Sequence, residues 1–167
     1  TPDPGPRTPD PGPRTPDPDT PMPTCILHTD GGARGNPGPA AAGIVLTAED
    51  GKTPLFEAGY FLGETTNNVA EYTALLRGLD AAGKLGYDAV VIRCDSELMV
   101  KQLLGEYRVK AAHLKPLYTE AMDRLDRQAS WEVGHVYREQ NQRADHLANR
   151  AMDAARDVIP TPLPESA

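Results

Sequence analysis

The segment TCILHTDGGARGNPG spans residues 24–38 and joins a short apolar run to an aspartate followed by several glycines. The apolar run, residues 24–29, favours a β-strand, and Asp30-Gly31-Gly32 favours a turn at its end. We therefore expect Asp30 to end the first strand of a sheet, with a glycine-rich loop after it.

The apolar pattern beyond this segment predicts a mixed α/β sheet. Residues 40–48 and 55–63 flank Asp50-Gly51, a strong hairpin signal, so the first three strands should form an antiparallel meander. The further predicted elements are a helix capped within 65–68 and ended by Gly86, a strand over 89–94, a short helix from Ser96 to Gly105, a helix over 114–127, a strand over 131–137 and a helix over 144–156. The order β-β-β-α-β-α-α-β-α predicts a five-stranded mixed sheet with helices packed on both faces.

The two ends of the chain differ in composition from the part between them. Residues 1–14 are the heptapeptide TPDPGPR written twice, and a third copy begins at Thr15. Frequent proline keeps a chain extended without a core. We therefore expect a disordered leader over residues 1–23, which could connect to an upstream domain or partner, one domain over 24–158 and a flexible tail over 159–167.

Composition argues against a transmembrane protein. Of the 167 residues 39% are apolar, and no apolar run approaches the ~20 residues that cross a bilayer. The 17 Lys and Arg against 24 Asp and Glu give a net charge of -7, which is unfavourable for phosphate binding. Cys25 and Cys94 lie in apolar runs and are expected to be buried, reduced thiols. We expect a cytoplasmic monomer.

Four acidic residues fall at the predicted ends of elements. Asp30 and Asp95 end the first and fourth strands, which would bring them together if these strands are parallel neighbours. Glu71 lies in the first turn of the first helix, and Asp145 opens the last helix. Clustered carboxylates repel one another unless a cation compensates them, and such ligands suit Mg²⁺ or Mn²⁺. Each acid alone also has a structural explanation, because carboxylates are favoured at helix N-termini.

Four motifs around these acids resemble type 1 ribonuclease H. They are T-D-G-x-x-x-G-N-P-G at residues 29–38, T-T-N-N-x-x-E at 65–71, D-S at 95–96 and H-x9-D at 135–145. The resemblance covers about residues 24–156, with the motifs in family order, and implies the ribonuclease H-like fold. It also implies an endonuclease that hydrolyses the RNA strand of RNA/DNA hybrids by two-metal-ion catalysis and leaves 5′-phosphate and 3′-hydroxyl ends.

The resemblance assigns catalytic roles to matching residues. Asp30, Glu71, Asp95 and Asp145 would coordinate two Mg²⁺ ions, for which Mn²⁺ could substitute. His135 matches a histidine that assists proton transfer or product release, a role that suits a side chain titrating near neutral pH.

The resemblance also assigns substrate contacts. Recognition of a hybrid requires contacts to ribose 2′-hydroxyls across the minor groove. In the family, the glycine-rich loop and the asparagine pair make these contacts, and the matching residues are Gly31, Gly32, Ala33, Asn36, Asn67 and Asn68. Thr66 matches a position that helps to hold a DNA-strand phosphate.

Two other functions fit parts of the pattern. A non-catalytic hybrid-binding module of the same fold would not need four acids that repel phosphate. Another nuclease of the superfamily, such as a transposase-like or junction-resolving domain, would lack the motifs at 29–38 and 65–68. Residues 105–112 are too few for the extra helix and basic loop of larger members, so the sequence resembles the compact form of the family.

Overall fold

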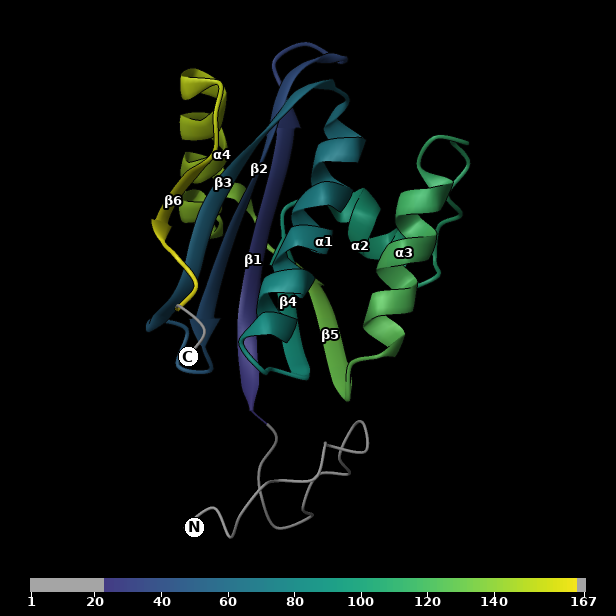
Figure 1. The fold of residues 1–167 in the computed structure, drawn as a ribbon. Helices are drawn as coiled ribbons and strands as arrows, with labels where there is room; N and C mark the ends of the chain where they lie inside the picture. Colours follow the sequence, from purple (N-terminus) through teal and green to yellow (C-terminus); the bar gives the residue numbers. More distant parts are fainter. Residues whose placement is uncertain (1–22, 165–167) are drawn as a thin grey trace, which may run out of the picture.

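A single six-stranded sheet forms the centre of the computed structural model, which describes residues 23–164 (Figure 1). The strands are β1 (Thr24–Ala33), β2 (Gly38–Ala48), β3 (Pro54–Thr65), β4 (Ala89–Cys94), β5 (Ser130–His135) and β6 (Val158–Thr161). Their order is β5-β4-β1-β2-β3-β6, with β4 parallel to β1 and β5 and the other neighbours antiparallel. Residues 1–22 of the predicted leader and 165–167 of the predicted tail lie outside the described residues.

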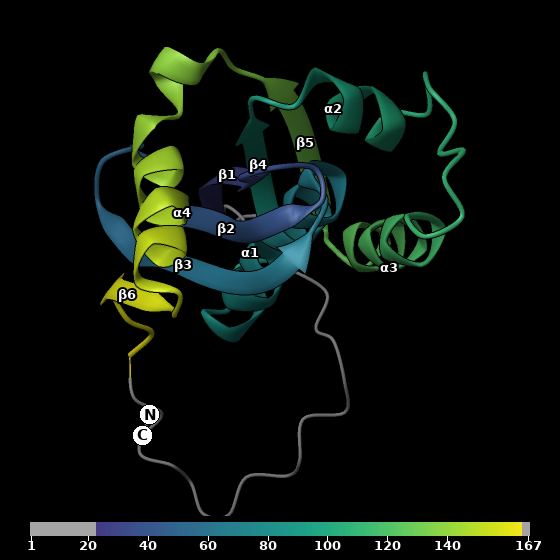
Figure 2. The same cartoon turned by 90° about the horizontal axis from the view of Figure 1, so that it is seen from above.

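Helices cover both faces of the sheet, as Figure 2 shows. Residues 23–164 form α1 (Asn67–Lys84), α2 (Glu97–Leu103), α3 (Lys115–Asp126) and α4 (Gln142–Ala154), with a short 3-10 helix, η1 (Arg138–Gln140), before α4. α1 packs on β1 and β2, whereas α4 packs on the opposite face of β2 and β3. The predicted mixed sheet with helices on both faces is confirmed. Within the same residues no helix is long and apolar enough to cross a bilayer.

The main core lies between the sheet and α1, and it extends to α2 and α3. Its apolar side chains come from alternate positions of the strands and from one face of each helix. The large members with almost no exposure are Tyr72, Leu27, Ile44, Leu46, Leu75, Val90, Ile92, Met99 and Leu125. Because this core fills the space between the sheet and the helices, it fixes the positions of β1, β4 and α1 relative to one another.

Local signals placed several turns and helix starts correctly. The hydroxyl of Thr66 accepts a hydrogen bond from the Val69 N–H and caps α1, and Ser96 caps α2 in the same way. At the β2–β3 turn the carboxylate of Asp50 accepts the N–H of Lys52 at 2.9 Å. These side chains satisfy backbone donors that the ends of the elements leave free.

The prediction of five strands was wrong by one. Residues 158–161, which include the first three residues of the predicted flexible tail, form β6 and pair with β3. The hydroxyl of Thr161 donates to Glu57 of β3 at 3.0 Å, and the Phe61 N–H donates to Asp157 at 2.9 Å. Pro160 is compatible with this strand because β6 is at the edge of the sheet, where a missing N–H is tolerated.

Two predicted boundaries near the acids were also wrong. β1 does not end at Asp30, which pairs with Gly43 of β2, but continues to Ala33. The reason is that Gly31 lies against the backbone of α1, where a Cβ atom would collide with Ala70, so the glycine extends the strand under the helix. Glu71 lies in the second turn of α1 because that helix begins at Asn67.

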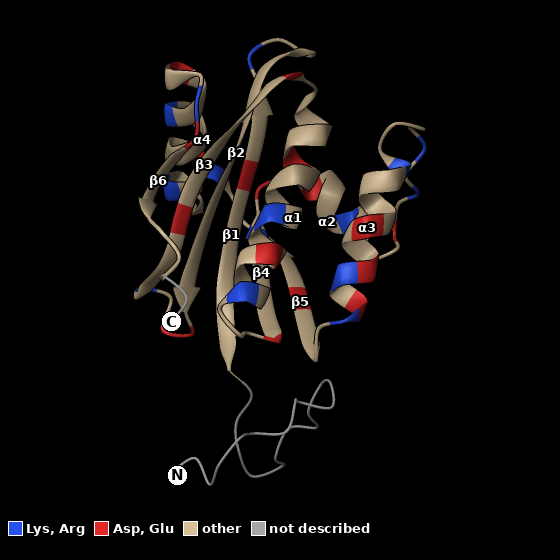
Figure 3. Cartoon of the chain, in the orientation of Figure 1, with Lys and Arg blue, Asp and Glu red and all other residues tan. Residues whose placement is uncertain are grey.

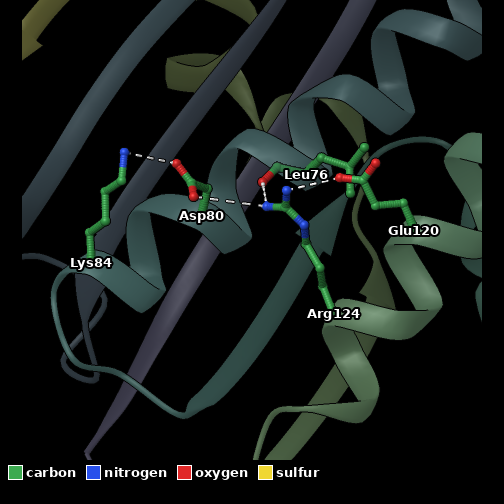
Figure 4. A network of polar contacts seen from close by, with 5 residues as sticks. All are labelled: Leu76, Asp80, Lys84, Glu120 and Arg124. Carbon is green, nitrogen blue, oxygen red and sulfur yellow. Dashed lines mark hydrogen bonds and ion pairs between the residues drawn. The ribbon is translucent and has the colours of Figure 1, made fainter.

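Arg124 attaches α3 to α1 through a network of polar contacts (Figure 4). Its guanidinium donates to the main-chain carbonyl of Leu76 at 3.3 Å and lies 4.0 Å from Asp80, both on α1. The same group donates to Glu120 of α3 at 2.8 Å, and Lys84 pairs with Asp80 at 3.1 Å. The network holds α3 against α1.

Candidate active site

The parallel pairing of β1 and β4 brings three carboxylates together. Thr29 and Cys94 are paired in register, and each immediately precedes an acidic residue, Asp30 or Asp95. Glu71 reaches the same place from α1. One carboxylate oxygen of each of the three acids lies within 4.8 Å of the others. The predicted meeting of Asp30 and Asp95 therefore occurs, although Asp30 lies within its strand.

Glu71 is fixed by groups on both sides of it. Its Oε1 accepts a hydrogen bond from the Gly31 N–H, and its carboxylate also accepts one from the hydroxyl of Ser96. Only 8% of Glu71 is exposed. The glycine at position 31 therefore serves two purposes: it lets α1 approach β1, and its N–H orients a carboxylate of the cluster.

Burial and mutual repulsion oppose ionisation of the cluster. Burial raises the pKa of Asp30 to about 9, and the charges of Glu71, Asp95 and Asp145 add to the effect. Burial, followed by the charge of Asp95, raises the pKa of Glu71 to about 8, against the effect of the Gly31 N–H. Near neutral pH the cluster therefore binds either protons or a compensating cation.

The chemistry of the three acids fits a divalent metal ion. Carboxylate oxygens are hard ligands, and Mg²⁺ and Mn²⁺ bind through a few of them while keeping some of their waters. Asp30, Glu71 and Asp95 supply such oxygens at close range. A cation bound there would offset the burial and mutual repulsion that raise the pKa values of Asp30 and Glu71. This buried acidic triad is the candidate metal centre of the described residues.

A cavity of about 410 Å³ opens beside the triad. All four predicted carboxylates line it, including Asp145, which lies in the first turn of α4 but is not part of the close group of three. The predicted substrate-binding residues on its wall are Gly31, Gly32, Ala33, Asn67 and Asn68. The cavity therefore joins the candidate metal ligands to most of the candidate substrate contacts.

The glycine-rich loop and the asparagine pair are bound to each other. The Ala33 N–H donates to Oδ1 of Asn67 at 2.7 Å, and the Asn67 N–H donates to Oδ1 of Asn36 at 3.0 Å. These bonds join the end of β1 to the start of α1, although the residues are more than 30 positions apart. The two motifs therefore form one hydrogen-bonded surface at the edge of the cavity.

Three predicted site residues do not line the cavity. Asn36 supports Asn67 from the loop, and the Thr66 hydroxyl accepts the Val69 N–H as the cap of α1. His135 is exposed at the end of β5, where it pairs with Cys94 of β4. Its ring packs edge-on against that of Tyr137, with 5.3 Å between the ring centroids. His135 thus lies at the end of the sheet that carries Asp95.

The structure adds cavity residues that sequence reasoning missed: Arg34, Ser96, Arg138, Asn149 and Met152. Asn149 lies four residues after Asp145, and this helical spacing could have revealed it. Arg34 occupies a variable position of the motif at 29–38, so the motif gave no reason to select it. Arg138 belongs to η1, which no periodic pattern predicted.

Residues 104–114, between α2 and α3, form no helix. They include Arg108 and Lys110, and basic positions are visible there in Figure 3. These residues carry no extra helix, which agrees with the compact form predicted from the sequence.

Comparisons with known proteins identify relatives of this fold and site. The family described as reverse transcriptase-like matches residues 28–151. A ribonuclease H of Pseudomonas putida is 33% identical over 145 residues, covering 78% of this chain and 94% of that protein. The bifunctional protein Rv2228c of Mycobacterium tuberculosis is 44% identical over 130 residues, covering 78% of this chain but only 36% of that protein.

A solved structure resembles both the sequence and the fold. The structure of LC11-RNase H1 in complex with an RNA/DNA hybrid superposes with a TM-score of 0.74 at 44% identity, covering 78% of this chain and 98% of that one. The fold, the order of the motifs and these matches agree, and the chain belongs to the type 1 ribonuclease H family.

Proposed function

We propose that this chain is an endonuclease that hydrolyses the RNA strand of RNA/DNA hybrids. The observation that carries the proposal is the single cavity lined by four carboxylates and by the surface of the glycine-rich loop and Asn67-Asn68. Support also comes from LC11-RNase H1, which has been solved with an RNA/DNA hybrid. The proposal concerns this domain, since the chain spans about a third of the bifunctional mycobacterial relative.

The four carboxylates would hold the catalytic metal. Asp30, Glu71 and Asp95 are the close group, and Asp145 lines the same cavity. Two Mg²⁺ ions bound there, or Mn²⁺ in their place, would supply activation of water and stabilisation of the leaving oxygen, giving a 5′-phosphate and a 3′-hydroxyl. The Gly31 N–H holds Glu71 in place before any ligand arrives, so its carboxylate needs no reorganisation.

The surface beside the carboxylates would select the hybrid. Gly31, Gly32 and Ala33 are half-buried at the cavity wall, and their small or absent side chains would let a nucleic-acid backbone approach the main chain closely. The amide of Asn68 and the Oδ1 of Asn67 are close to them. Small residues and amides suit contacts to ribose 2′-hydroxyls in a shallow minor groove, which distinguish an RNA strand from DNA.

Two residues outside the cavity wall keep subsidiary roles in the proposal. His135, exposed at the end of β5, would assist proton transfer or product release rather than hold metal. Thr66 begins α1 and would present the start of that helix to a DNA-strand phosphate, while its hydroxyl continues to cap the helix.

The remaining proposals concern cellular context. Cys25 and Cys94 are buried, unpaired thiols, which supports a reducing compartment such as the cytoplasm. The proposed assembly is a monomer whose leader joins it to an upstream domain or partner. Sedimentation of the full chain would test whether it is a monomer, and a dimer would contradict that proposal.

The proposed activity is tested by cleavage of a labelled RNA/DNA hybrid in Mg²⁺. Duplex RNA, duplex DNA and single-stranded RNA serve as comparison substrates, and end-group analysis identifies the products. Asp95→Asn should abolish cleavage. Asp88→Asn, at the opposite end of β4 and exposed, is the matched control and should cleave like the wild type.

Each outcome separates the candidate functions. Hybrid that is bound but left intact by the wild type would favour a non-catalytic binding module. Equal cleavage of duplex DNA would favour another nuclease of the superfamily. Cleavage by Asp95→Asn at the wild-type rate would contradict the assignment of the carboxylate cluster.

A further inference from the structure

Arg34 connects the end of β1 to α4 beside the cavity. It follows the last residue of β1, and its Nη2 lies 2.7 Å from Oδ1 of Asp153 on α4. The same nitrogen donates to Oδ1 of Asn149 at 3.4 Å. Asn149 in turn donates to the main-chain carbonyl of Asp145 at 3.1 Å. The guanidinium therefore lies at the rim of the cavity, on the face of α4 that carries a candidate metal ligand.

The ion pair between Arg34 and Asp153 is weak enough to be exchanged. The two side chains are 49% and 67% exposed. Ion pairs in such solvent contact contribute about 0–1 kcal/mol, because water screens them and both side chains lose freedom. A phosphate offers the guanidinium two oxygens and shorter, charge-assisted hydrogen bonds. An arriving phosphate can therefore displace Asp153 at little cost.

The electrostatics of the cavity favour such an exchange. Four carboxylates line it, whereas the basic side chains among its lining residues are Arg34 and Arg138. A nucleic-acid strand that places one phosphate at the carboxylates brings further phosphates near the rim. Positive charge at the rim offsets their repulsion.

We infer that Arg34 binds a backbone phosphate of the RNA strand, within one or two nucleotides of the cleaved bond, and that Asp153 holds the guanidinium ready until the hybrid displaces it. The inference rests on the proposed function, since it takes the hybrid as substrate. Asp153 is then a competitor of the substrate for Arg34 and not a binding residue.

The alternative is that the ion pair only fastens the loop to α4. The two roles predict opposite changes in hybrid affinity when Asp153 loses its charge. A fastening pair is weakened equally from either end, so loss of either partner should reduce hybrid binding. In a competing pair, loss of Arg34 weakens binding and loss of the Asp153 charge strengthens it.

The test measures hybrid affinity for Arg34→Ala, Asp153→Asn and the double variant. Fluorescence anisotropy of a labelled hybrid is recorded with Ca²⁺ in place of Mg²⁺, and a gel verifies that the RNA strand stays intact. We expect Arg34→Ala to weaken binding about tenfold and to reduce the salt dependence of log K by about one unit. Asp153→Asn should strengthen binding about threefold.

Charge-matched controls isolate the local effect. Lys84→Ala and Asp123→Asn change exposed charges on α1 and α3 away from the cavity. In the Arg34→Ala background, Asp153→Asn should do no more than Asp123→Asn does. Thermal unfolding confirms that every variant is folded.

The outcomes distinguish this inference from the proposed function. Weaker binding by Asp153→Asn, or an Arg34→Ala variant that behaves like Lys84→Ala, would overturn the role of Arg34 while wild-type cleavage continued. Failure of the wild type to bind or cleave the hybrid would instead overturn the proposed function.

Discussion

The side-chain amide of Asn141 donates a hydrogen bond of 2.8 Å to the main-chain carbonyl of Thr29, across 112 positions of the chain. Thr29 immediately precedes Asp30 in β1, and Asn141 immediately precedes α4, whose first turn carries Asp145. Asn141 is only 2% exposed. One buried hydrogen bond therefore connects the two elements that bring these carboxylates to the same cavity.

Replacing Asn141 should affect both stability and turnover. Asn141→Ala leaves the buried Thr29 carbonyl without its donor, which costs about 1–3 kcal/mol of unfolding free energy. Because α4 then loses its tie to β1, kcat should fall more than KM rises. Chemical denaturation and steady-state cleavage of a hybrid measure the two effects. Gln142→Ala, the exposed neighbour, is the control, and an unchanged kcat in folded Asn141→Ala would limit the bond to a structural role.

His135 should contribute to rate without being essential. Its ring is exposed and packs on Tyr137, and it does not line the cavity that holds the carboxylates. His135→Ala should therefore lower kcat while leaving measurable cleavage and a nearly unchanged KM. Single-turnover and steady-state rates on the same hybrid would show whether chemistry or product release slows. Complete loss of cleavage in both would contradict an auxiliary role.

The sequence predicted the parts of the fold that depend on local signals. Apolar runs, the Asp50-Gly51 turn and the caps Thr66 and Ser96 are each decided within a few residues, and the structure has them where they were expected. β6 was missed because Pro160 and the short apolar run look like a tail. Its pairing depends on β3, about 100 positions earlier in the chain.

For the candidate site too, the sequence predicted what depends on local patterns and missed the contacts between distant residues. The motifs selected the four carboxylates because their residue types and order are visible in the sequence. The tertiary contacts of Arg34 with Asp153, and of Asn141 with Thr29, join positions more than 100 residues apart. No local pattern reports which distant groups a side chain will meet, so these contacts became visible only in the folded chain.

The space around two glycines predicts opposite effects when each is replaced by alanine. Gly43 pairs with Asp30, and a Cβ atom there would collide with the Ala144 carbonyl of α4. Gly43→Ala should destabilise the protein by about 3 kcal/mol and move Asp145 away from Asp30, so cleavage should fall. Gly83→Ala fills open space in α1 and should stabilise by about 0.5–1 kcal/mol with unchanged cleavage. Equal stability of the two variants would contradict the close packing.

The carboxylate cluster predicts how metal-free stability depends on pH. Asp30 and Glu71 have pKa values raised to about 9 and about 8 in the folded chain, whereas carboxyl groups of an unfolded chain titrate near pH 4. Between these values the folded state binds more protons than the unfolded state. The stabilisation from this excess is fully present below about pH 4 and is lost as pH rises through about 8 to 9. The Tm of protein treated with a chelator should therefore be lower at pH 8 than at pH 6, and Asp30→Asn should flatten this difference.

The stabilisation of the folded chain by bound metal should have the opposite pH dependence. A divalent cation binds the ionised carboxylates, so protons compete with it, and its stabilising effect should be larger at pH 8 than at pH 6. Thermal scans with and without Mg²⁺ at the two pH values measure this difference. Asp123→Asn, an exposed substitution on α3, should respond to Mg²⁺ like the wild type, whereas Asp30→Asn should respond much less. A Mg²⁺ effect that is equal at both pH values, or that survives in Asp30→Asn, would mean that the ion binds elsewhere than at the cluster.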